Sequence, residues 1–184
     1  MKTKTKACIA ALCAVVLVAA SVFATVAYLT STATVTNTFT YGNVKITLDE
    51  AKVNEYGATE DAPRVTGNTY RLIPGHTYTK DPTIHVDADS EDCWIFAKVE
   101  NGLGDAATIN MSEGWTPVAE NSNVYYYNTI VEKNANQTIF SSFQFDKDAN
   151  PESYSTVNIK ITAYAVQADG FTSAVDAWNA AFAD

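Results

Sequence analysis

Residues 157–165 read VNIKITAYA, and this stretch decides the fold class. Apolar Val, Ile, Ile, Ala and Ala side chains occupy every second position, with Asn, Lys, Thr and Tyr between them. Such alternation is typical of a β-strand with one buried face, because successive side chains of a strand point to opposite faces. The sequence therefore predicts a long, half-buried strand in this part of the chain.

Other strand-like segments precede this one, and turn-forming residues separate them. A polar stretch with Gly57, Pro63 and Gly67 predicts a long exposed loop over residues 50–68. The predicted strands are 44–49, 70–73, 83–86, 94–99, 115–118, 124–127, 129–133 and 138–145. Many short strands at regular spacing indicate an all-β domain, and we expect a jelly-roll-like antiparallel β-sandwich.

One short helix is predicted after the last strand. Its apolar residues recur at helical spacing and form a stripe, with Thr172 or Ser173 as the N-cap. The stripe consists of Phe171, Val175, Trp178 and Phe182.

The first residues of the chain have the pattern of a secretory signal. Lys2, Lys4 and Lys6 precede an almost unbroken apolar run over residues 7–20. Small residues then fit cleavage after Ala27. We expect a signal peptide over 1–27 and a secreted domain over 28–184 that starts at Tyr28. The alternative is an uncleaved anchor, since about 20 apolar residues span a bilayer, and contact with the membrane is expected only through that uncleaved segment.

Composition limits the partners of the expected mature domain. Without residues 1–27 it keeps 9 basic and 21 acidic residues, a formal net charge of −12. This charge repels nucleic acid, and the sequence has no basic cluster that would bind it. No nucleic-acid partner is therefore expected. Cys93 would be the single remaining cysteine, which excludes an intramolecular disulfide and favours a packed thiol.

Motifs for catalysis are absent from the sequence. The only histidines are His76 and His85, and they do not form the His-Glu-x-x-His pattern of zinc peptidases. There is also no Gly-x-Ser-x-Gly elbow, Walker loop or dinucleotide fingerprint. We therefore expect a protein that is not an enzyme, with no catalytic residue and no organic cofactor.

An acidic run offers the one candidate metal site. Asp87, Asp89 and Glu91 place carboxylates on alternate residues, which suits a hard cation such as calcium. The glycine and distal glutamate of an EF-hand are missing, so the alternative is a solvated turn between two strands.

Aromatic residues offer a second candidate for binding. They could line a sugar-binding face or pack within the core, which is the commoner use of aromatic side chains. The residues in question are Trp94, Trp115, Tyr125, Tyr126 and Tyr127.

Three stretches of the chain resemble one protein family. Residues 26–48 read VAYLTSTATVTNTFTYGNVKITL, in which Asn37, Phe39, Gly42 and Val44 fit an Asn-x-Phe-x-x-Gly-x-Val segment. Leu72-Ile-Pro-Gly precedes Lys80-Asp-Pro-Thr-Ile-His-Val, and residues 163–171 read AYAVQADGF. Together they are similar to the TasA/camelysin-like proteins of Gram-positive bacteria.

This resemblance implies a function. Proteins of that family carry a signal peptide processed by a SipW-type signal peptidase and form jelly-roll subunits of fibres in the biofilm matrix or at the cell surface. Fibres assemble when the mature N-terminal segment is donated to a neighbour as a strand. Here that segment is 28–41, with Val35, Asn37 and Phe39 in the assembly strand; alternatively it pairs within its own domain.

Two other functions stay open. One is a carbohydrate-binding or adhesin module on the bacterial surface. The other is a camelysin-type metalloprotease, for which the sequence offers no metal-ligand motif.

Overall fold

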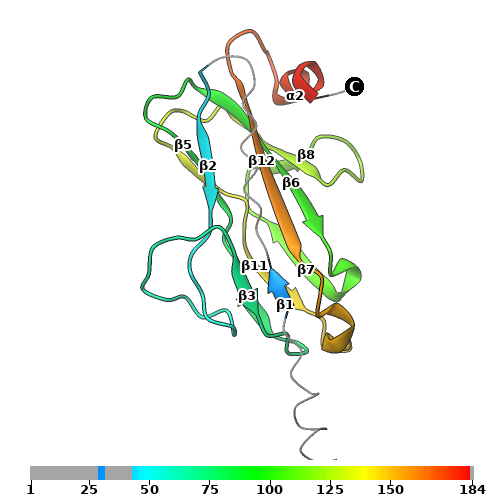
Figure 1. Cartoon of the computed structure of the whole chain (residues 1–184). Coiled ribbons are helices and arrows are strands. Elements are labelled where there is room, and N and C mark those ends of the chain that lie inside the picture. Colours follow the sequence, from blue (N-terminus) through cyan, green and yellow to red (C-terminus); the bar gives the residue numbers. More distant parts are fainter. Residues whose placement is uncertain (1–28, 32–42, 183–184) are drawn as a thin grey trace, which may run out of the picture.

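The computed structural model describes residues 29–31 and 43–182, the first three by their backbone alone. Antiparallel strands are the main regular structure of this part, and one helix follows them (Figure 1). The strands are β1 (Leu29–Ser31), β2 (Ile46–Asp49), β3 (Asn68–Tyr70), β4 (Thr77–Thr79), β5 (Thr83–Val86), β6 (Cys93–Asn101), β7 (Ala107–Met111), β8 (Trp115–Pro117), β9 (Val124–Tyr127), β10 (Asn136–Thr138), β11 (Phe140–Phe145) and β12 (Ile159–Gln167). Two 3-10 turns, η1 (Gly104–Ala106) and η2 (Pro151–Tyr154), and helix α2 (Ala174–Phe182) complete the described elements.

The described strands form four antiparallel sheets. Their strand orders are β1-β3, β10-β5-β2, β4-β11-β7 and β12-β6-β9-β8. All four sheets, apart from β1, whose side chains are not described, contribute to one buried hydrophobic cluster, so they surround a common core. For the described residues, the prediction of an all-β domain with one C-terminal helix is confirmed.

The β6–β12 ladder is the longest pairing in the described part of the chain. It runs without a break from Ile159 opposite Asn101 to Gln167 opposite Cys93. The predicted strand over 157–165 is therefore real but begins two residues later. The carbonyl of Asn158 instead accepts a hydrogen bond from the backbone N–H of Gly102 at 2.9 Å, next to the first residue pair of the ladder.

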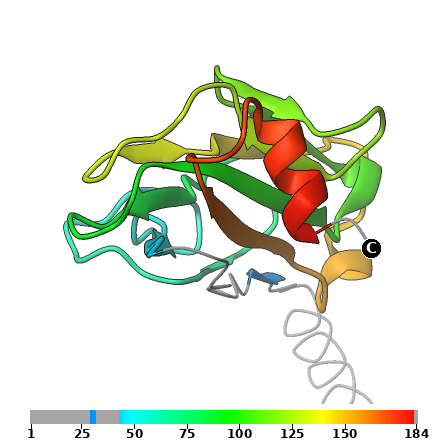
Figure 2. The ribbon, with the colours of Figure 1, turned by 90° about the horizontal axis from the view of Figure 1, so that it is seen from above.

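Alternation along this ladder divides its side chains between two cores. One face of β6 and β12 joins the common core through residues such as Ile95 and Ile161, both fully buried. The opposite face carries Trp94, Phe96 and Val166, which form a second cluster with α2. Figure 2 shows α2 lying across this sheet. The first half of β6 is buried on both faces for this reason.

Helix α2 begins as the sequence predicts. Ser173 caps it, since its hydroxyl accepts a hydrogen bond from the backbone N–H of Asp176 at 3.1 Å. The buried face is centred on Ala174 and Ala177 instead of Val175. These small residues let the helix approach the sheet, and Trp178 packs 5.0 Å from the ring of Phe96.

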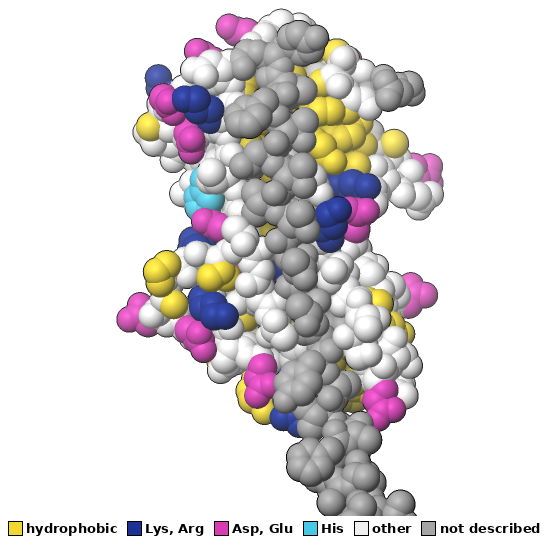
Figure 3. All heavy atoms as spheres, in the orientation of Figure 1, with side chains coloured by type: hydrophobic (Ala, Val, Ile, Leu, Met, Phe, Trp, Pro, Cys, Tyr) yellow, Lys and Arg dark blue, Asp and Glu magenta, His cyan; other side chains and the backbone are white. Residues whose placement is uncertain are grey.

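The outer face of the ladder changes character beyond α2. There Glu100 forms ion pairs with Lys98 at 3.2 Å and with Lys160 at 3.7 Å. All three side chains are partly exposed. Figure 3 shows hydrophobic side chains gathered near α2 and charged ones below them. One face thus serves as a core at one end and as a solvated surface at the other.

Some predicted boundaries were wrong. The strand predicted over 70–73 lies at Asn68–Tyr70, and the strand predicted over 129–133 is reduced to one bridge between Val131 and Cys93. The segment predicted over 138–145 divides into β10 and β11. Strands β4 and β7 were not predicted.

Candidate functional site

Strand β1 belongs to segment 28–41, which the family resemblance predicts to be an assembly strand. It pairs antiparallel with β3, with Leu29 opposite Tyr70, Thr30 opposite Thr69 and Ser31 opposite Asn68. In the single chain these three residues therefore pair within their own domain. Ala27, Tyr28, Val35, Asn37 and Phe39 lie outside the described residues.

Strand β3 is where the described N-terminal residues pair with the rest of the domain. Within the described part of the chain, β1 is its one partner in a sheet. Its outer residue Thr69 is exposed, whereas Asn68 and Tyr70 are buried. Strands β2 and β12, the terminal strands of their sheets in the described region, lie beside each other on the same face of the molecule (Figures 1 and 2).

A buried polar group, which we call the buried triad, lies directly behind β3. It consists of Glu50 after β2, Asn68 in β3 and Lys80 after β4, with relative exposures of 1%, 3% and 1%. Glu50 accepts a hydrogen bond from Lys80 Nζ at 2.5 Å through Oε2 and one from Asn68 Nδ2 at 2.9 Å through Oε1. The triad connects three strand ends that are distant in sequence.

Backbone groups fix the orientation of the Asn68 carboxamide. Its Nδ2 also donates to the carbonyl of Ala51 at 2.8 Å, and its Oδ1 accepts from the backbone N–H of Val53 at 3.0 Å. A carbonyl can only accept and an amide N–H can only donate, so the two ends of the carboxamide cannot exchange. The loop over 50–68, predicted to be exposed, is thus anchored at both ends in the interior.

Aromatic rings close this region. Tyr70 contacts Tyr78 with ring centroids 5.5 Å apart and Phe143 at 5.2 Å. Burial raises the pKa of Tyr70 above its ordinary value, and the nearby negative charge of Glu50 adds to this effect. Tyr70 and Tyr78 are fully buried, so they shield the triad from solvent.

A partly exposed charged cluster borders the triad. Arg64 donates to Asp49 at 2.5 Å and to Asp81 at 2.9 Å, and His85 contacts Asp49 at 2.8 Å. Partial burial alone would raise the pKa of Asp49, but the hydrogen bonds from Arg64 and His85 hold it below its ordinary value. The cluster ties the loop that holds Arg64 to the ends of β2 and β4.

The calcium candidates Asp87, Asp89 and Glu91 lie between β5 and β6. Asp89 pairs with Lys45, and this hydrogen bond lowers the pKa of the Asp89 carboxyl. Glu91 uses its backbone N–H to bond Asn43 at 3.1 Å. No group of three or more His, Cys, Asp or Glu side chains within residues 43–182 is arranged to hold a metal ion.

The other candidate groups are separated. His76 contacts the carbonyl of Tyr56 at 2.9 Å, whereas His85 belongs to the Arg64 cluster. Cys93 is fully buried, and burial raises the pKa of its thiol to about 12, as expected for a packed thiol.

The aromatic residues proposed for sugar binding do not share one face. Trp115, Tyr125 and Tyr127 pack against the common core. Trp94 and Tyr126 pack on the opposite side of the same sheet, against α2.

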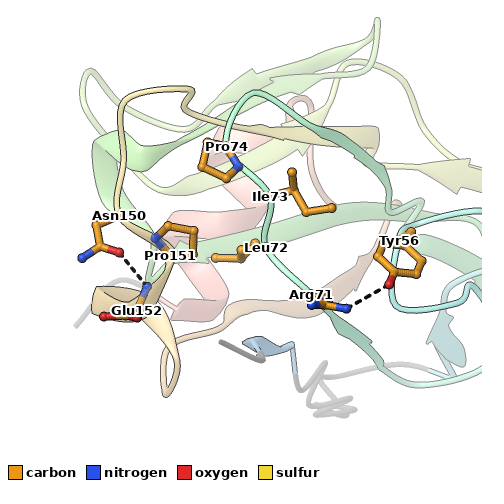
Figure 4. Close-up of a pocket in the computed structure, with 8 residues that line it drawn as sticks. All are labelled: Tyr56, Arg71, Leu72, Ile73, Pro74, Asn150, Pro151 and Glu152. Atoms are coloured by element: carbon orange, nitrogen blue, oxygen red, sulfur yellow. Dashed lines mark hydrogen bonds between the residues drawn. The ribbon is translucent and has the colours of Figure 1, made fainter. Parts of the chain in front are cut away.

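A pocket with a volume of about 490 Å³ lies beside the segment that follows β3. Figure 4 shows residues 71–74 on one side and residues 150–152 on another. Arg71 donates to the hydroxyl of Tyr56 at 3.0 Å at its edge, and Tyr56 and Ile73 remain exposed. An arginine beside exposed apolar side chains could accept a polar ligand.

Comparison with known proteins gives no match: no family model, curated protein or solved structure corresponds to this chain. Among the described helices none is long and apolar enough to cross a membrane.

The buried triad was missed in the sequence. Glu50 lies 18 positions from Asn68 and 30 from Lys80, and no local periodicity joins them. A lysine next to the unpredicted strand β4 reads as a surface residue, because lysines are almost never fully buried unless paired.

Proposed function

We propose that this protein is a secreted structural protein that forms fibres in the biofilm matrix or at the cell surface by strand addition. The observation that carries the proposal is the short β1–β3 ladder, in which β3 takes a strand from the N-terminal segment. A neighbouring copy that offers the same segment would form the same backbone hydrogen bonds, so exchange costs little enthalpy.

The rest of the proposal rests on sequence. We infer from it that residues 1–27 are a signal peptide removed by a SipW-type signal peptidase and that the strands are connected as a jelly roll. Residues 32–41, including Val35, Asn37 and Phe39, carry no charge and are rich in threonine, which suits an added strand. No catalytic activity and no cofactor are assigned.

The test compares the mature protein with a variant that lacks residues 28–41, using electron microscopy and size-exclusion chromatography at high concentration. We expect fibres from the first and monomers from the second. Phe39→Asp should also stop assembly. Ile130→Asp, at an exposed apolar residue outside residues 28–41, is the control and should leave assembly intact. Monomers of the mature protein in all conditions would refute the proposal.

The pocket beside Arg71 favours a second candidate, a surface module that binds a polar ligand such as a glycan. Glycan-array binding that is lost in Arg71→Ala and kept in Lys98→Ala would support it. Absence of binding by the unchanged protein would exclude it.

A further inference from the structure

We propose that the buried triad forms an intramolecular isopeptide bond between Lys80 Nζ and Asn68 Cγ, with Glu50 as the catalytic residue. This inference concerns a covalent modification of the chain itself. It holds whether or not the protein assembles into fibres.

The first argument is placement. Lys80 Nζ and Asn68 Nδ2 are hydrogen-bonded to the two oxygens of one carboxylate, at 2.5 Å and 2.9 Å. The amine and the carboxamide thus both contact the same carboxylate. Fixing a nucleophile next to its target replaces a bimolecular encounter and removes most of its entropic cost.

The second argument is burial. The side chains of Lys80 and Glu50 are 0% and 1% exposed. Burial therefore keeps water away from this pair and from any reaction between its members. Transfer of one proton from the Lys80 ammonium to Glu50 removes both charges and leaves a neutral amine, which is the nucleophilic form.

The third argument is the environment of Asn68. The backbone N–H of Val53 donates to Oδ1 at 3.0 Å. Negative charge develops on this oxygen when the amine adds to Cγ, so the N–H acts as an oxyanion-hole donor. The carbonyl of Ala51 holds Nδ2, the leaving group, on the opposite end.

The step balances without an oxidant or a co-reactant. Glu50 accepts a proton from the Lys80 ammonium, and the neutral Nζ adds to Cγ. Glu50 then transfers protons from Nζ to Nδ2, the Cγ–Nδ2 bond breaks, and ammonia leaves as ammonium. The Nζ–Cγ bond has formed, Glu50 is again a carboxylate, and no electrons are gained or lost.

The bond would connect parts that share no ladder. Among the described strands, β3 pairs with β1, and β4 pairs with β11. A covalent link from Asn68 to Lys80 would therefore attach the strand that receives β1 to a different sheet.

The primary test is the intact mass of the secreted full chain, measured under denaturing conditions with its N-terminus determined. We expect a mass lower than that of the sequence by one ammonia. A peptide map then locates the loss. Trypsin cuts after Arg64, Arg71 and Lys98, so the reacted chain gives residues 65–71 joined to residues 72–98, uncut at Lys80. Separate peptides 65–71 and 72–80 together with the full mass would overturn the proposal.

Variants assign the roles. Glu50→Gln should keep the full mass, and Asn68→Asp should lose one water instead of one ammonia. Asn101→Ala is the matched control, because Asn101 precedes Gly102 and can lose ammonia by cyclising onto its own backbone. The mass deficit should persist in this control; a deficit that disappears with Asn101, without the joined peptide, would refute the isopeptide bond. If Glu50→Gln fails to fold, the peptide map of the unchanged protein still decides.

Discussion

The β6–β12 ladder and the β1–β3 ladder are both held by antiparallel backbone hydrogen bonds, but they differ in length and in the packing on their faces. The first pairs nine residues on each strand, and its first half has hydrophobic clusters on both faces. The second pairs three, and its outer residue Thr69 faces solvent. Each fully buried apolar side chain adds about 1.5–3 kcal/mol. Packing on the faces, more than the hydrogen bonds themselves, therefore decides which ladder can open.

Hydrogen exchange tests this difference most directly. Amides of the β6–β12 ladder should exchange only through global unfolding, whereas those of β1 should exchange through local opening. Global stabilities are about 5–15 kcal/mol, so we expect rates that differ by a factor on the order of 10³ or more. Exchange measured by NMR or mass spectrometry checks this, and equal protection of both ladders would contradict it.

Removing one aromatic ring should weaken the stronger ladder. Phe96 is fully buried between β6 and α2. Phe96→Ala leaves a cavity there and should lower the free energy of unfolding by about 3–5 kcal/mol, measured by chemical denaturation. Thr69→Ala, at the exposed residue of β3, is the control and should change this free energy by less than about 0.5 kcal/mol. Similar losses in both variants would show that face packing does not distinguish the ladders.

The cap of α2 should contribute less than the ring beneath it. Ser173→Ala removes the hydrogen bond to the Asp176 N–H, and a cap of this kind is worth about 1 kcal/mol. Thermal and chemical denaturation measure the loss, and Thr156→Ala, at an exposed residue before β12, serves as the control. An unchanged stability of Ser173→Ala would mean that packing alone holds the helix on the ladder.

The smallest expected effect is the loss of stability in acid that comes from Asp49, at the end of β2. The pKa of Asp49 is lower in the folded chain than its ordinary value of 3.8, so in that range the unfolded chain binds more protons. The contribution of Asp49 is complete above pH 3.8 and is lost as the pH falls through the folded pKa.

Asp49→Asn should therefore cost about 0.5 kcal/mol near neutral pH, as for solvent-screened ion pairs, and should flatten the acid limb of the stability curve. Urea titrations across this pH range measure both effects. Asp61→Asn, at an exposed carboxylate of the loop that holds Arg64, should leave the curve unchanged. If Asp49→Asn does not alter the acid limb, the Arg64–Asp49–His85 cluster does not contribute to the pH dependence of stability.

The same contrast explains what the sequence could predict. Alternation reveals β12, because one of its faces is buried all the way from Ile159 to Ala165. It does not reveal β4, where Tyr78 is the single apolar residue between two threonines. The strand predicted over 129–133 fails since only Val131 is buried, and Asn134 then takes a positive φ of 64° that ends the extended backbone. The buried triad is invisible for a different reason: long-range topology brings its members together, and each one alone looks like a surface residue.

The position of Glu50 has a mechanical consequence. Tension on the N-terminal segment would enter the domain at β3, the partner of β1. Because Glu50 holds Asn68 and Lys80 at once, this tension is shared with the end of β4 and passes on to β11. Peeling β3 away would require a buried carboxylate to lose its partners first. Strand β3 is thus attached to the interior through Asn68 and Glu50, and because both side chains are buried, water cannot replace their hydrogen bond.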